Sequence, residues 1–122
     1  MKTILLLILS FALFGCETTT KGEKCVTIEM VYTDESIDEL IEVCTDQEFL
    51  LGVLEENQDE IGLETNDSSS DVYLNGLKGY NFETLKMNYY WAVYVNSDYA
   101  IYGVAKQPIA DGDVFKFEAT SY

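Results

Sequence analysis

Residues 25–32 and 39–44 each alternate apolar and polar side chains, and the six residues between these two stretches are mostly polar. Successive side chains of a strand point to opposite faces, so each stretch would have one apolar face. The intervening residues have the composition of a connection between strands. Pairing Ile28 with Ile41 puts the apolar residues of both stretches on the same face. The pattern therefore predicts an antiparallel β-hairpin.

The same register sets Cys25 directly opposite Cys44 on the other face of the hairpin, within reach of a disulfide bond. Disulfides persist mainly outside the cytoplasm, so this interpretation requires an exported protein. Two free thiols are the alternative.

The amino-terminal residues have the order of an export signal. Lys2 supplies a positive charge, residues 4–14 are almost wholly apolar, and Cys16 follows closely. This apolar run is well short of the ~20 residues that a membrane-spanning helix needs. Residues 13–16 resemble the lipobox of bacterial lipoproteins, in which cleavage precedes the cysteine and its sulfur carries diacylglycerol. A signal peptide over residues 1–15 and lipidation of Cys16 are predicted; a plain secretory signal is the alternative.

A mature chain that begins at Cys16 would have a polar, flexible tether over residues 16–24 and one folded domain over residues 25–122. We expect it at the bacterial cell surface, anchored to the outer face of the membrane by its lipid. The chain has 7 basic and 22 acidic residues, no histidine and a net charge of −15. A polyanion would be repelled by this charge, which excludes nucleic acid as a partner.

After the hairpin, the pattern changes to the spacing of a helix. Thr45 and Glu48 have the spacing of a capping box, and residues 49–54 carry an apolar stripe. Gly52 within this helix suggests a close contact with the sheet. Strands are then predicted over residues 61–65, 72–74, 89–95 and 114–120, with an irregular segment over residues 77–87. This order predicts an α+β fold: a β-grasp-like roll with an N-terminal β-hairpin and one helix packed on a mixed sheet of about five strands.

Several short motifs in the second half of the chain occur in the order found in one known family. They are Val53–Glu56, Leu74–Leu77, Tyr90-Trp91, Gly103–Ala105, Asp111–Phe115 and Thr120–Tyr122. In this respect the chain resembles the transcobalamin-like carboxy-terminal domain family, which implies a β-grasp-like domain. In the animal carriers, that domain covers one face of a corrinoid and a separate helical barrel covers the other.

No part of this sequence resembles the helical barrel, and no histidine could displace the axial ligand of cobalt. Corrinoid binding would therefore be one-sided, through stacking and hydrogen bonds. The resemblance also implies that bacterial members are lipoproteins that serve vitamin-uptake transporters.

Aromatic residues concentrate in one part of the chain: seven of the nine tyrosines lie between Tyr73 and Tyr102, together with Trp91. A tyrosine has a flat apolar ring and a polar tip, which suits a flat ligand with a polar rim or a protein surface. The candidate ligand-binding residues are Asn75, Gly76, Tyr90, Tyr94, Tyr99, Tyr102 and Gly103. Alternatively, these rings simply build and cover the sheet, and Trp91 is expected in the core.

Catalysis is not predicted, because the absence of histidine excludes Ser–His and Cys–His chemistry. Two cysteines are too few for a zinc site, and the segment Asp111–Asp113 is interpreted as a turn rather than a calcium site. No metal or cofactor is expected. The predicted function is capture of cobalamin or a related corrinoid for a membrane transporter; the alternative is a surface module that docks a protein partner without a small-molecule ligand.

Overall fold

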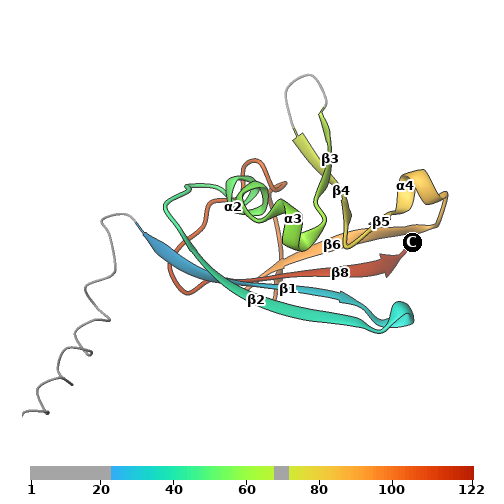
Figure 1. The fold of residues 1–122 in the computed structure, drawn as a ribbon, viewed down its shortest axis with the longest axis horizontal. Coiled ribbons are helices and arrows are strands. Elements are labelled where there is room, and N and C mark those ends of the chain that lie inside the picture. Colours follow the sequence, from blue (N-terminus) through green and yellow to red (C-terminus); the bar gives the residue numbers. More distant parts are fainter. Residues whose placement is uncertain (1–22, 68–71) are drawn as a thin grey trace, which may run out of the picture.

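In the computed structural model, the described residues are 23–67 and 72–122 (Figure 1). The predicted signal peptide over residues 1–15, Cys16 and most of the predicted tether lie outside these residues. Within the described ranges, no helix is long and apolar enough to cross a membrane.

The predicted hairpin is confirmed, with the predicted register. It consists of β1 (Lys24–Tyr32), the short helix η1 (Thr33–Glu35) and β2 (Ile37–Thr45). Ile28 lies opposite Ile41, and Cys25 lies opposite Cys44. A disulfide bond joins the two cysteines. The face of β1 that carries Ile28 is buried, as the alternation of residues predicts.

A five-stranded mixed sheet forms one layer of the molecule, in the order β2-β1-β8-β6-β7. Its remaining strands are β6 (Tyr89–Val95), β7 (Asp98–Tyr99) and β8 (Val114–Ser121). The carboxy-terminal strand β8 lies in the centre, parallel to β1 and antiparallel to β6. The first and last strands of the domain are therefore direct neighbours (Figure 1).

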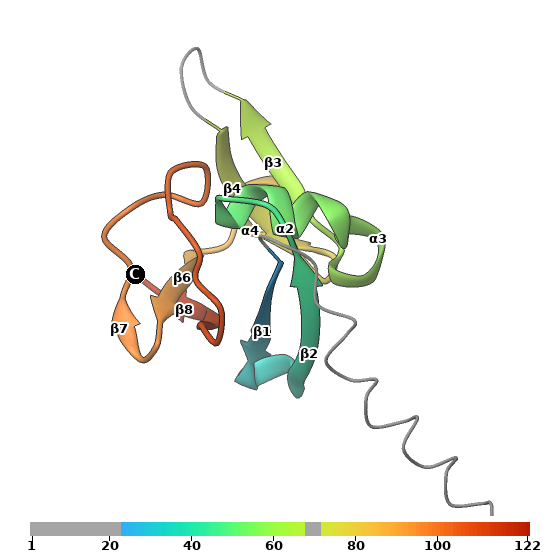
Figure 2. The same cartoon turned by 90° about the vertical axis from the view of Figure 1, so that its left-hand side faces the viewer.

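Short helices and a second, three-stranded sheet lie on one side of this sheet, and part of the small sheet extends away from the large one (Figure 2). They are α2 (Leu50–Glu56), α3 (Gln58–Ile61), β3 (Glu64–Asp67), β4 (Val72–Leu77), β5 (Tyr80–Asn81) and α4 (Phe82–Leu85). Leu50 and Leu54 of α2 share a buried cluster with Ile28, Phe115 and Phe117 of the large sheet, all at 0% exposure. The predicted α+β class, with a helix on a five-stranded mixed sheet, is confirmed.

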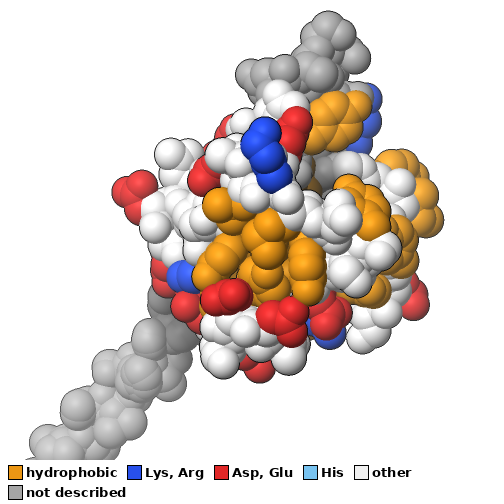
Figure 3. Space-filling view, turned by 90° about the vertical axis from the view of Figure 1, so that its right-hand side faces the viewer, with side chains coloured by type: hydrophobic (Ala, Val, Ile, Leu, Met, Phe, Trp, Pro, Cys, Tyr) orange, Lys and Arg blue, Asp and Glu red, His pale blue; other side chains and the backbone are white. Residues whose placement is uncertain are grey.

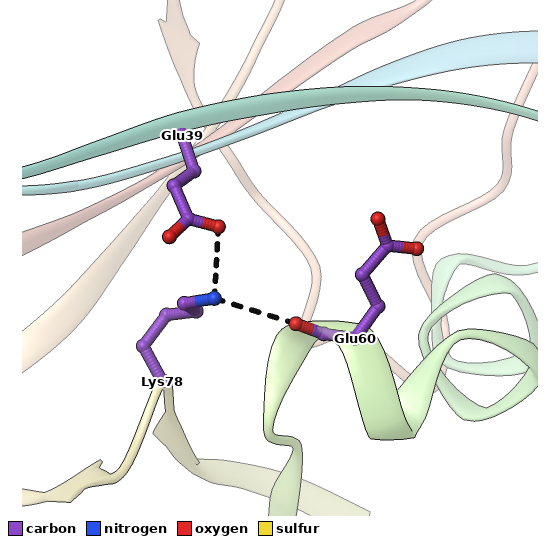
Figure 4. A network of polar contacts seen from close by, with 3 residues as sticks. All are labelled: Glu39, Glu60 and Lys78. Atoms are coloured by element: carbon purple, nitrogen blue, oxygen red, sulfur yellow. Dashed lines mark hydrogen bonds and ion pairs between the residues drawn. The ribbon is translucent and has the colours of Figure 1, made fainter.

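A lysine in the turn after β4 links the two layers at the surface (Figure 4). Lys78 Nζ lies 2.8 Å from Glu39 Oε1 of β2 and 3.4 Å from the carbonyl oxygen of Glu60 in α3. Such exposed ion pairs contribute little to stability, so burial of the apolar cluster dominates the packing of the layers.

The predicted start of the helix is wrong. Thr45 is the last residue of β2, and α2 begins at Leu50, with Phe49 as an N-cap that makes no side-chain hydrogen bond. Pairing with β1 holds Thr45 in the extended conformation. Its hydroxyl accepts a hydrogen bond from the Gln47 N–H and donates one to Glu56 Oε1 at 2.8 Å.

Three further expectations differ from the structure. A Cβ atom on Gly52 would collide with the side chain of Gln47, so the close neighbour there is Gln47 and not the sheet. Ile61 ends α3, and the strand predicted from this residue begins only at Glu64. The segment 77–87, expected to be irregular, contains β5 and α4.

Candidate ligand-binding site

Five aromatic rings pack together at the end of the large sheet where η1 and α4 lie. They belong to Tyr32, Tyr80, Phe82, Tyr89 and Trp91. Tyr32 is the central ring, with its centroid 5.0 Å from that of Tyr80 and 6.2 Å from that of Trp91 in edge-to-face contacts. The Trp91 indole N–H donates to the Tyr80 carbonyl oxygen at 3.0 Å. Edge-to-face packing and this hydrogen bond fix the positions of these rings relative to one another.

Two carboxylates of η1 accept hydrogen bonds from tyrosine hydroxyls of this cluster. The Tyr89 hydroxyl donates to Asp34 Oδ2 at 2.7 Å, and the Tyr80 hydroxyl donates to Glu35 Oε1 at 3.1 Å. Each hydrogen bond is the main reason that the pKa of its tyrosine lies above the ordinary value of 10.0. Both hydroxyls therefore remain donors at neutral pH. Figure 3 shows the resulting apolar and aromatic surface, with acidic side chains along its lower border.

Beside the cluster lies a hollow of about 390 Å³, which we call the β6 hollow. It is lined by the rings of Phe82, Tyr89, Tyr90, Trp91 and Tyr122 and by Leu74, Asn75, Glu83 and Met87. Asn75 Nδ2 donates to Glu83 Oε1 at 3.2 Å, so the amide and the carboxylate side chains of the lining are joined. The volume lies in the range of small-molecule sites.

One wall of the β6 hollow is a strand edge. Along its length β6 pairs with β8, but on the other side β7 pairs only with Tyr94 and Val95. Among the described strands, the segment Tyr89–Ala92 therefore pairs with β8 on one side and with no strand on the other. A strand edge of this kind presents backbone N–H and C=O groups that a ligand can use.

The structure brings some of the predicted ligand residues together. Asn75 and Tyr90 both line the β6 hollow, and Tyr90 packs on Tyr122 with 5.1 Å between ring centroids. A hydrogen bond with Tyr99 raises the pKa of Tyr90 above its ordinary value. The Tyr99 ring also contacts Tyr94 edge-on at 5.6 Å. Tyr90, Tyr94 and Tyr99 thus form one group of interacting tyrosines. Of these three residues, Tyr90 lines the hollow, and Tyr94 and Tyr99 do not.

The other predicted residues lie elsewhere. Tyr102 is 55% exposed in the segment between β7 and β8. Gly103 lines a separate, small hollow of about 80 Å³ with Tyr73 of β4. Gly76 is buried in β4 and pairs with Asn81 of β5. None of these three residues lines the β6 hollow.

Gly76 and Gly103 provide a test of these placements. A Cβ atom on Gly76 would lie 3.1 Å from Asn81 Cα and from the Tyr80 carbonyl oxygen, whereas a Cβ atom on Gly103 would meet nothing within 4 Å. We expect Gly76→Ala to lower the free energy of unfolding by about 2 kcal/mol because backbone atoms must shift. Gly103→Ala, the control, is expected to change it by less than about 0.5 kcal/mol. Urea denaturation measures both, and equal losses would contradict the placement of Gly76.

Sequence reasoning missed most of the lining. Phe82, Glu83 and Met87 lie in the segment that was expected to be irregular, and Tyr122 was noted only as part of a terminal motif. One local signal was present: the Asn81 side chain accepts a hydrogen bond from the Thr84 N–H at 3.1 Å and caps α4. This N-cap spacing predicts a helical turn that contains Phe82 and Glu83.

The predicted turn over Asp111–Asp113 is confirmed, and its carboxylates make structural contacts. Asp111 Oδ1 accepts from the Cys25 N–H at 2.7 Å, and Asp113 Oδ2 accepts from the Ala110 N–H at 2.9 Å. Within residues 23–67 and 72–122, no group of three or more His, Cys, Asp or Glu side chains could hold a metal ion.

Two solved structures share this architecture. A proposed metal-binding protein from Ruminococcus gnavus ATCC 29149 superposes with a TM-score of 0.70 at 16% identity, over 81% of this chain and 98% of that chain. Haptocorrin in complex with Cbi gives a TM-score of 0.69 at 16% identity, over 85% of this chain. The chain spans only 26% of the haptocorrin chain. The similarity to haptocorrin supports the transcobalamin-like fold that the sequence resemblance implies.

The family itself follows from the sequence. Residues 48–121 match the model of a domain of unknown function, DUF4430, and the chain belongs to this family. No curated protein matches the chain.

Proposed function

We propose that this protein binds a flat ligand of the corrinoid class, cobalamin or a related molecule, in the β6 hollow. The proposal rests on one observation: the β6 hollow combines five lining aromatic rings, the Asn75 amide and a strand edge without a ladder partner. The rings are those of Phe82, Tyr89, Tyr90, Trp91 and Tyr122. The fold is shared with haptocorrin, whose structure was determined in complex with Cbi. Binding rather than catalysis is proposed, because the chain has no histidine and the hollow supplies stacking surfaces instead of a nucleophile.

The lining suits a ring system with polar substituents. The packed rings of Tyr90 and Tyr122 offer apolar faces for stacking, while the Asn75 amide offers hydrogen bonds to a polar rim. A hollow of about 390 Å³ is too small to enclose a corrinoid, so the protein would cover one side of the ligand. A membrane transporter is the proposed partner that receives the ligand from its open side.

The Tyr90 ring provides the direct test of this site. We expect Tyr90→Ala to weaken the binding of hydroxocobalamin or cobinamide by about tenfold, because one stacking surface is lost. Isothermal titration calorimetry on the purified protein measures this change.

Tyr73→Ala is the matched control, because Tyr73 is half exposed on β4 and does not line the β6 hollow. The Tyr73→Ala protein should bind hydroxocobalamin or cobinamide as tightly as the unaltered protein does. Absence of heat and of any change in visible absorbance at high ligand concentration would contradict corrinoid binding itself. Equal weakening by both substitutions would contradict the proposed site.

The proposed location is the outer face of the bacterial membrane, with Cys16 as the lipid attachment point. The β6 hollow lies at the η1 end of β1, and the tether would enter at the other end, at Lys24. A nine-residue strand spans roughly 30 Å. With this anchor, the ligand would be held away from the lipid surface, where a transporter can reach it.

Replacing Cys16 tests the anchor. We expect Cys16→Ser to abolish the incorporation of radiolabelled palmitate into the protein, because the sulfur that would carry the lipid is lost. Immunoprecipitation from labelled cells measures the incorporation. Ser10→Ala, within the same amino-terminal segment, is the control and should keep the label. A Cys16→Ser protein that still incorporates palmitate would contradict lipidation of Cys16.

A further inference from the structure

We propose that the β6 hollow selects positively charged ligands over neutral ligands of the same shape. This inference rests on the proposed function, because it takes the β6 hollow to be the ligand site. It adds the sign of the ligand's charge, which neither the fold nor the family description specifies.

The lining itself favours a cation. The faces of aromatic rings carry negative electrostatic potential and attract cations within about 6 Å of the ring centroid. Five of the nine lining residues are aromatic, and Glu83 has the single charged side chain among them. The Asn75 amide donates to Glu83 Oε1 at 3.2 Å, which orients the carboxylate beside the rings. A cation in the hollow would therefore lie among aromatic rings and near a carboxylate.

Charges around the hollow act in the same direction. Asp34 accepts a hydrogen bond from Tyr89, so a second carboxylate lies at the hydroxyl of a residue that lines the hollow. Two lysines belong to nearby segments, but neither lines the hollow: Lys86 follows α4, and Lys78 is paired with Glu39 at 2.8 Å. With a net charge of −15, the whole chain adds a negative field that attracts cations.

Another hollow of the molecule gives an internal contrast. A second hollow of about 340 Å³ is lined by Tyr94, Glu118 and Lys116, among other residues. There the Lys116 ammonium lies 5.7 Å from the Tyr94 ring centroid and 3.7 Å from Glu118 Oε1. The protein thus places its own cation against a ring and a carboxylate in this second hollow. The β6 hollow has the same two kinds of group but no lysine in its lining.

A pair of probes with the same shape and different charge tests the inference. Choline carries a trimethylammonium group, and 3,3-dimethylbutan-1-ol carries the neutral tert-butyl group in the same position. Trp91 is the chain's single tryptophan and lines the hollow, so its fluorescence reports occupancy of the site. We expect choline to bind about tenfold more tightly than the neutral alcohol at low salt.

Substitution of Glu83 separates a charge effect from a shape effect. Glu83→Gln is expected to weaken choline binding about threefold and to leave the alcohol unchanged. Glu55→Gln, which removes the same charge from an exposed position on α2, is the control and should change neither affinity.

Each outcome has a distinct meaning. If corrinoids bind but choline and the alcohol bind equally or not at all, charge selection is wrong and the proposed function stands. If choline is selected but corrinoids do not bind, the charge inference stands and the corrinoid assignment is wrong. If neither the probes nor the corrinoids bind, both are wrong.

Discussion

Replacement of Phe117 by alanine is expected to lower the free energy of unfolding by about 4 kcal/mol. Phe117 is 0% exposed in the central strand β8, where it lies beside Met30 of β1 and opposite Val93 of β6. Removal of its ring leaves a cavity between the two layers, which neighbouring strands cannot close without breaking their ladders. Urea denaturation followed by circular dichroism measures the loss.

Val114 provides the control for this prediction, because it begins the same strand but is 40% exposed. Val114→Ala should change the free energy of unfolding by less than about 0.5 kcal/mol. A loss below about 1 kcal/mol for Phe117→Ala would contradict a core centred on β8.

Removal of the disulfide is expected to have the second-largest effect. The double variant Cys25→Ala/Cys44→Ala should lose about 3 kcal/mol, because the bond closes a loop between residues 19 positions apart and restricts the unfolded chain. The hairpin ladder remains, so the far-ultraviolet spectrum of the folded protein should not change. Chemical denaturation of the oxidised protein and of the double variant measures the difference.

The unaltered protein in a reducing agent should reproduce the loss seen in the double variant. The double variant itself should be insensitive to reduction. An unaltered protein whose denaturation midpoint is the same with and without reductant would contradict a stabilising disulfide.

Much of the large sheet could be predicted from the sequence because its signal is local. Alternation in β1 and β2 fixes which residues share a face, and a shift of one residue would expose Ile28 and Ile41. The start of α2 could not be predicted in this way. The same Thr45 that has a capping-box spacing is held in β2 by a strand partner distant in sequence, and such tertiary pairing overrides local propensity.

The candidate site was predicted only in part, because the β6 hollow combines distant segments. The sequence indicated Tyr90 by its aromatic ring and Asn75 by its place in a family motif, and both line the hollow. Glu83 and Tyr122 were not selected, because only the folded chain places the turn after β5 and the last residue beside the edge of β6. Gly76 was selected for its position in a motif, but its lack of a side chain permits close pairing of β4 with β5.

The most direct test of the central claim is the fluorescence lifetime of Trp91 during titration with hydroxocobalamin. A corrin ring absorbs where tryptophan emits, so a corrinoid bound beside Trp91 shortens the lifetime by energy transfer. Absorption by free ligand lowers the intensity but leaves the lifetime unchanged. We expect a saturable shortening that Tyr90→Ala shifts to about tenfold higher ligand concentration. A lifetime that stays constant throughout the titration would contradict a corrinoid site in the β6 hollow.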